Sequence, residues 1–410
     1  MIRLLIAVLT IAIFSAGCAV QELVVAEETQ LVVATSSVDE ALLLDIGIVE
    51  FDAGIPEDNN PMKTGIYDDI RRAEAKYLPY HLKTTLQGSG YWGAVRVIPS
   101  TSAFTDVIIN GAIKKSDGEY VELEIAVSDA AGRHWFTRTY ETQTGLTSYS
   151  KRRDRSRDPY QKVFNDLSND LQEYAAALPA RQLQQTRQVS ELQFFQDMSP
   201  NAYSGYLTRD KGGIANVVRL PAENDPSVAR MRQIRERDRL VVDTLNEHYA
   251  NFYYGIAIPY NSWRKTSRAE TVKFRQEKRS ANLQALVGVV VLAGSTQINT
   301  NTSSRNTNNI NRALQYQGIT RGLNSVFDGL RRNRDAGLHL DAIAELSESF
   351  GNEAAPMVVN VEGQERRLTG TAEAQYESWR QLLREIYEAE TGLTQSVEVG
   401  APARAPEPTS

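Results

Sequence analysis

Apolar and polar positions in the first third of the chain follow a pattern that predicts one helix and several strands. At 120–129, aliphatic residues from Val121 to Val127 alternate with polar or small ones, which is typical of a strand with one buried face. Similar patterns predict a strand at 42–51, a helix at 66–87 that kinks or breaks at Pro79, and strands at 91–98, 106–114 and 134–142. Because the strands mostly follow one another, we expect an α+β domain at 42–145 with a small, mostly antiparallel sheet covered on one side.

The rest of the chain is dominated by apolar residues spaced three and four apart, which is typical of amphipathic helices. This spacing predicts helices at 159–178, 182–197, 226–251, 264–284, 312–334, 338–350 and 371–390, with 252–260 interrupting the third, a loop at 201–224 and a short hairpin across 357–368. We therefore expect a larger, mainly helical domain at 159–390. Three prolines and the loss of periodicity predict a disordered tail at 391–410.

Ten apolar residues at 285–294 precede a segment rich in Asn, Thr and Ser at 295–311. Ten residues are too few for a membrane-spanning helix, which needs about 20, although a transmembrane β-strand needs only about 9 to 11. A helix buried among the others is the simpler interpretation, and a membrane-inserted segment near 285–311 is the alternative. We expect 295–311 to be a disordered loop, with a glycan-binding or self-association surface as the second interpretation.

The amino terminus has a positive start at 1–3, an apolar stretch at 4–14 and then Ser15-Ala16-Gly17-Cys18. An apolar stretch of this length fits a secretory signal peptide. The motif resembles the lipobox of bacterial lipoproteins, although Ser15 stands where that family most often has Leu. The alternative is an ordinary signal peptide or short anchor with an incidental cysteine.

The lipoprotein resemblance implies three expectations about the first part of the chain. Residues 1–17 are a signal peptide that is removed before Cys18, and the signal peptidase recognises Ser15, Ala16 and Gly17. The Cys18 thiol carries a diacylglyceryl group, and two or more acyl chains hold a protein stably on a bilayer. Ala19, rather than Asp, implies sorting to the outer membrane, and 18–41 is the lipidated cysteine with its tether.

Element order in the predicted α+β domain provides a second resemblance, together with the sequences IGIVEF at 46–51 and VIING at 107–111. These features are similar to the periplasmic domain shared by curli-secretion channel lipoproteins and lipoprotein activators of penicillin-binding proteins. The resemblance covers 42–141 and carries no functional residue over to this chain.

Charge is unevenly distributed along the sequence. Without residues 1–17 the formal balance is 44 basic minus 51 acidic side chains, or −7, with −10 in 18–150 and +6 in 181–280. The asymmetry has three interpretations: contact between the two regions, an anionic partner such as lipid headgroups or cell-wall polymer, or a solvated helical face of mixed charge. The solvated face is the simplest of the three.

The sequence contains no catalytic signature that we can identify. One cysteine excludes an intramolecular disulfide and a thiolate metal cluster, and neither a Gly-x-Ser-x-Gly elbow nor a phosphate loop occurs. The histidines His81, His134, His248 and His339 are far apart, and we expect each to be at the surface or half-buried.

These observations predict a non-enzymatic scaffold or accessory component of an envelope assembly. It would lie on the periplasmic face of the outer membrane and bind the bilayer through acylated Cys18. We expect an envelope protein or a second copy as partner, and no nucleic acid, cofactor or metal. The alternatives are a subunit of an oligomeric outer-membrane secretion channel with a membrane-inserted segment near 285–311, and an enzyme whose site joins residues distant in sequence.

Overall fold

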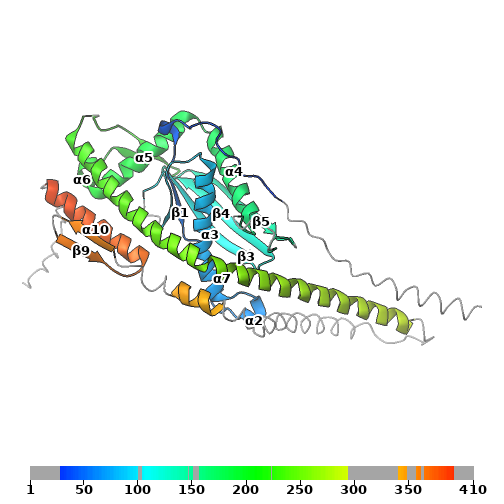
Figure 1. Cartoon of the computed structure of the whole chain (residues 1–410). Coiled ribbons are helices and arrows are strands. Elements are labelled where there is room, and N and C mark those ends of the chain that lie inside the picture. The colour runs from blue at the N-terminus through cyan, green and yellow to red at the C-terminus, as the bar shows by residue number, and fades with distance from the viewer. Residues whose placement is uncertain are drawn as a thin grey trace, which may run out of the picture.

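The computed structural model describes residues 28–99, 104–145, 147–150, 157–222, 224–293, 340–348, 357–361 and 364–391. It confirms an α+β protein, with a five-stranded sheet in the amino-terminal region and mostly helices after it (Figure 1). The predictions on the signal peptide, Cys18, 294–339 and the tail from 392 lie outside the described residues.

The sheet is mixed, with strand order β2-β1-β3-β4-β5. Its strands are β1 (Ile46–Val49), β2 (Val95–Ile98), β3 (Val107–Ser116), β4 (Tyr120–Asp129) and β5 (His134–Gln143). The expected antiparallel pairing holds for β3, β4 and β5, whereas β1 is parallel to both β2 and β3. The parallel pairings arise because α3 returns the chain between β1 and β2, and β3 then begins at the same end of the sheet on the other side of β1.

Helix α3 (Asp68–Ser89) is continuous through Pro79, where the sequence predicts a kink or a break. A proline inside a helix leaves the carbonyl four residues earlier without its N–H donor. Here the Phe51 N–H donates to the Ala75 carbonyl at 3.0 Å. The chain just after β1 therefore compensates for the hydrogen bond that Pro79 removes.

The remaining elements largely match the predicted positions. They are η1 (Glu40–Leu42), α2 (Pro61–Thr64), α4 (Gln161–Ala177), α5 (Ala180–Met198), α6 (Pro200–Tyr203), β6 (Leu207–Arg209), β7 (Ala215–Val217), α7 (Pro226–Ala293), a helix at 340–348, β8 (Met357–Val361), β9 (Gln364–Leu368) and α10 (Ala372–Thr391). The β8–β9 hairpin is confirmed. The predicted loop at 201–224 is wrong in part, because it contains the hairpin formed by β6 and β7.

Helix α7 runs without a break for 68 residues, so the predicted interruption at 252–260 is wrong. Phe252, Ile256 and Tyr260 are spaced four apart and all are buried. Packing of this face offsets the cost of about 3 kcal/mol that a proline such as Pro259 imposes inside a helix. The apolar residues at 285–293 also have helical backbone and belong to α7.

Two buried apolar clusters meet along α7. The first joins the sheet, α3 and α4 to the middle of α7 through Tyr249, Phe252, Ile256, Tyr260 and Trp263. The second joins the start of α7 to α5 and α10, as the spacing of their apolar residues predicts. Because α7 contributes to both, it connects the predicted sheet domain to the predicted helical domain (Figure 1).

Candidate functional site

The predicted lipobox residues Ser15, Ala16, Gly17 and Cys18 lie outside the described residues, but the chain that follows them is placed from Glu28 onward. Part of the predicted tether lies along α4. Side-chain amides on α4 donate to main-chain carbonyls of this segment, from Asn165 to Thr29 at 2.7 Å and from Asn169 to Gln30 at 2.9 Å. The Asn169 amide oxygen also accepts from the Val32 N–H at 2.9 Å. The chain is therefore attached to the folded body by residue 29.

A buried ion pair connects α7 to the start of α4. Both guanidinium Nη atoms of Arg264 donate to Asp158, each at 2.8 Å, and the Arg264 side chain is 1% exposed. The Tyr77 hydroxyl donates to the same carboxylate at 3.2 Å, while the Tyr260 ring stacks against the guanidinium. Burial alone would raise the pKa of Asp158, but the Arg264 charge and its N–H donors hold that pKa well below its usual range.

A buried carboxyl group on α3 makes the second polar contact with α7. The hydroxyls of Ser116 and Tyr260 donate to one oxygen of Glu74, at 2.5 and 2.7 Å. Burial raises the pKa of Glu74, and this effect outweighs the lowering by the Arg71 charge and by the two hydroxyl donors. Ser116 is on β3, so this single carboxyl group ties α3, the sheet and α7 together.

The structure corrects the prediction for His81, which is buried rather than at the surface or half-buried. Its Nδ1 lies 2.7 Å from the Tyr253 hydroxyl and its Nε2 lies 2.9 Å from Gln161 Oε1. Burial lowers the pKa of His81 and favours the neutral ring. The signal in the sequence is its position four residues after Tyr77, which places both side chains on the buried face of α3.

The structure describes two of the other three histidines. His134 is exposed and His248 is half-buried, as expected, and His339 lies outside the described residues. Because the polar groups around Asp158, Glu74 and His81 are buried and bond mainly to one another, with Glu74 Oε2 and Arg264 Nε left without a hydrogen bond among the described residues, we interpret this network as structural.

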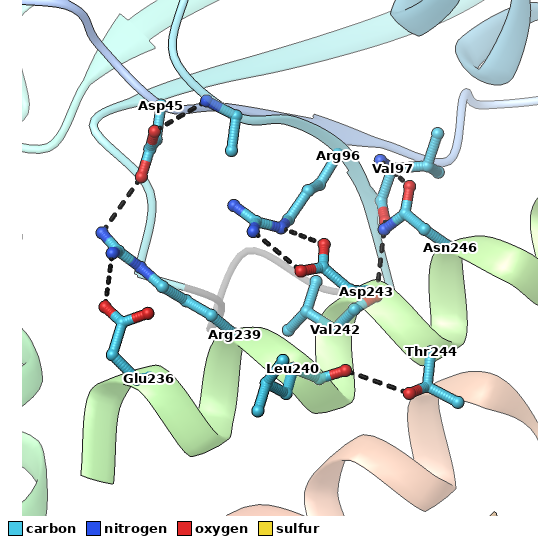
Figure 2. Close-up of polar contacts among 11 residues, drawn as sticks. Asp45, Arg96, Val97, Glu236, Arg239, Leu240, Val242, Asp243, Thr244 and Asn246 are labelled. Carbon is cyan, nitrogen blue, oxygen red and sulfur yellow. Dashed lines mark hydrogen bonds and ion pairs between the residues drawn. The ribbon is translucent and has the colours of Figure 1, made fainter. Parts of the chain in front are cut away.

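The acidic region 18–150 and the basic region 181–280 contact each other, as one of the three interpretations of the charge asymmetry predicted. Arg239 on α7 pairs with Asp45 at 3.0 Å, and Arg275 pairs with Glu119. Figure 2 shows the Asp45 pair, in which Arg239 also reaches Glu236 on its own helix. The interpretation as a solvated face still holds for exposed arginines such as Arg237.

Asn246 of α7 protects the outer edge of the sheet. Its side-chain amide donates to the Val97 carbonyl at 2.8 Å, and its oxygen accepts from the Val97 N–H at 2.9 Å (Figure 2). The amide thus makes the two hydrogen bonds that another strand would make. Since β2 is an edge strand, this pairing blocks further strand addition at Val97.

We expect Asn246→Leu to lower the free energy of unfolding by about 2 kcal/mol, because it leaves the buried Val97 N–H and carbonyl without partners. Urea denaturation of the full chain, followed by tryptophan fluorescence, measures this value. Thr244→Ala on the same helix removes only an exposed hydroxyl that donates to the Leu240 carbonyl, and it serves as the control. Equal losses in the two variants would contradict the edge-protecting role.

An open cavity of about 340 Å³ lies where η1 and the start of β3 meet α5 and α7. Its lining includes Asp106, Arg187, Glu191, Arg235 and Arg239. A smaller cavity of about 230 Å³ lies across the Arg96–Asp243 pair, beside Lys83. The larger cavity gathers charged groups from segments far apart in the sequence, which no local motif could reveal, and it is the candidate ligand site.

The described residues contain no group of three or more His, Cys, Asp and Glu side chains placed to hold a metal ion. Within the same part of the chain, no helix combines the length and hydropathy required to cross a bilayer. Comparisons with protein-family models, curated proteins and solved structures give no match to this chain.

Proposed function

We propose that the protein is a lipid-anchored lipoprotein on the periplasmic face of the outer membrane, where it acts as a non-enzymatic scaffold or accessory component of an envelope assembly. The observation that carries this proposal is the motif Ser15-Ala16-Gly17-Cys18 after a short apolar stretch. Acyl chains on Cys18 provide the membrane affinity that the motif implies.

The attachment of the chain to α4 adds a distance limit to this proposal. Residues 19–28 separate Cys18 from the part of the chain that Asn165 and Asn169 hold. Ten extended residues span at most about 35 Å. A protein anchored at Cys18 would therefore keep α4 close to the bilayer surface.

Helix α7 supports a role in holding partners. Its 68 residues correspond to a length of about 100 Å, and its carboxyl-terminal part continues past the sheet (Figure 1). Leu240, Tyr254 and Ile258 are 65%, 66% and 77% exposed. Their separations of 14 and 18 residues place them on one side of the helix. These exposed apolar side chains on a long helix, with Tyr254 and Ile258 one turn apart, suit an envelope protein partner or a second copy of the chain.

Metabolic labelling with palmitate tests the anchor. We expect the wild-type protein to incorporate label, and Cys18→Ala to incorporate none and to leave the outer-membrane fraction, because the thiol that accepts the lipid is absent. Ser15→Leu moves the motif towards the usual lipobox and should be labelled at least as well as the wild type. Equal labelling of the wild type and Cys18→Ala would refute the lipoprotein proposal.

The alternative function is a subunit of an oligomeric outer-membrane secretion channel. It rests on the apolar residues 285–293, which lie in the part of α7 that continues past the sheet. A ring extracted in detergent, or a conductance that disappears on deleting 285–311, would favour this alternative. A monodisperse monomer in detergent would contradict it.

A further inference from the structure

The cavity between α5 and α7 contains a buried guanidinium group without an ion-pair partner. The Arg235 side chain donates to the Ser190 hydroxyl at 2.8 Å, and the residue is only 8% exposed. Among the described residues, no carboxylate lies within the 4.0 Å ion-pair distance of this guanidinium. A buried charge is costly unless an opposite charge or several hydrogen bonds compensate it.

The carboxylates nearest to Arg235 are engaged elsewhere. Glu191 accepts from Arg232 at 2.8 and 3.4 Å. Asp45 pairs with Arg239 (Figure 2) and also accepts from the Ala94 N–H. Asp106 accepts from the Asp45 N–H at 2.9 Å. Because each of these three carboxylates already accepts from another donor, none of them forms an ion pair with Arg235.

Electrostatics at Arg235 agree with this geometry. Burial and the neighbouring charge of Arg239 hold the pKa of Arg235 below its ordinary value, in spite of Asp106, Glu191 and Asp45. Burial also raises the pKa of Asp106, which reduces its ability to act as a counter-charge. An additional anion in the cavity would therefore be stabilised by charge that the protein does not itself neutralise.

Further donors surround the same space. Arg187 is half-buried on the opposite wall, where its Nη1 donates to the Glu40 carbonyl at 2.6 Å and is thereby held in place. The side chains of Gln184 and Gln188 complete this wall. A volume of about 340 Å³ exceeds the roughly 30 Å³ that one water molecule occupies, so it has room for a small organic molecule.

We propose that this cavity binds the oxyanion group of a small molecule, a carboxylate or a phosphate, between Arg235 and Arg187. Guanidinium groups match both kinds of oxyanion through paired N–H donors. Nearby Asp106 and Glu191 would accept from a hydroxyl or amino group on the same molecule. This binding does not depend on acylation of Cys18. The cavity can therefore fail to bind an anion while the lipid anchor is present, and it can bind an anion while the anchor is absent.

Thermal unfolding of the purified full chain in detergent tests the site with inorganic phosphate and with acetate, each against sodium chloride at equal ionic strength. A ligand that binds only the folded state raises the midpoint temperature in a concentration-dependent way. We expect Arg235→Gln and Arg187→Gln to raise the half-saturating concentration by at least about tenfold, as for loss of one charge-assisted hydrogen bond. Arg237→Gln, on the same helix but paired with Glu390 outside the cavity, is the matched control and should leave that concentration unchanged.

The responses to acetate and to phosphate show which chemical class of ligand the cavity binds. A response to acetate identifies a carboxylate ligand and a response to phosphate alone identifies a phosphorylated one, and either supports the site. The proposal is overturned if neither anion raises the midpoint beyond chloride, or if Arg237→Gln weakens the response as much as Arg235→Gln does. Arg187→Gln keeps the test valid should the buried Arg235 variant fold poorly, because Arg187 is half-buried.

Discussion

Arg264→Met is expected to lower the free energy of unfolding by about 3–5 kcal/mol, because it leaves the Asp158 carboxylate buried without its counter-charge. The pair is bidentate and Arg264 is 1% exposed, so water cannot replace the lost partner. It also joins α7 to the start of α4, and the Tyr77 hydroxyl and Tyr160 N–H that remain on the carboxylate are neutral donors, which do not replace the lost charge. We expect urea denaturation of the full chain to show this loss as a lower midpoint.

Two further variants separate the buried pair from an ordinary surface charge. Arg232→Ala removes an exposed partner of Glu191 and should cost less than about 1 kcal/mol. Replacing both members of the buried pair, in Arg264→Met with Asp158→Leu, should cost less than Arg264→Met alone, because no buried charge is left unpaired. A double variant as unstable as the single one would show that packing, rather than charge, dominates at this position.

Lowering the pH is expected to reduce the loss of stability that Arg264→Met causes. In the wild type the pKa of Asp158 is held below its usual range, so its stabilising contribution is present above pH of about 4 and is lost as the pH falls further. Without Arg264, burial raises the pKa of Asp158, and protonation then relieves the unpaired charge. The difference between wild type and variant should therefore shrink as the pH falls, and a constant difference from pH 7 to 4 would contradict this account.

Gly118→Ala is expected to lower the free energy of unfolding by about 2–5 kcal/mol. Gly118 has a positive φ of 82°, and a Cβ there would lie 2.3 Å from the Arg264 carbonyl oxygen and 3.0 Å from the Arg268 nitrogen. A left-handed conformation costs an alanine about 1–2 kcal/mol, and the close approach of two backbones adds a further 1–3 kcal/mol. Because α7 would have to shift away from the β3–β4 turn, the buried network around Arg264 would be disturbed as well.

Gly213→Ala is a matched control for this substitution. Gly213 has a φ of 81°, but a Cβ there would meet no atom within 4 Å. The control therefore carries the conformational cost of about 1–2 kcal/mol without the steric cost. Urea denaturation of both variants isolates the close approach of α7 to the sheet, and equal losses would mean that this contact adjusts freely.

Most of the regular elements could be predicted from the sequence, because helix and strand periodicity depends only on neighbouring residues. Strand β4 and the final helix α10 match their predicted positions, and the apolar faces along the first part of α7 and along α10 are buried as predicted. The resemblance of Ser15-Ala16-Gly17-Cys18 to a lipobox is equally local, and the lipid anchor stays a prediction from the sequence.

Which elements are neighbours, and which polar groups meet, depends on the folded arrangement of the whole chain. The position of β1 between β2 and β3 depends on packing between segments far apart in the chain. The continuity of α7 through Pro259 depends on such packing as well. The same is true of buried His81 and of the cavity, whose residues Asp106, Arg187 and Arg235 come from three separate elements or their ends. Periodicity shows which side of an element is apolar, but a charge partner 106 residues away, as for Asp158 and Arg264, is set by the fold alone.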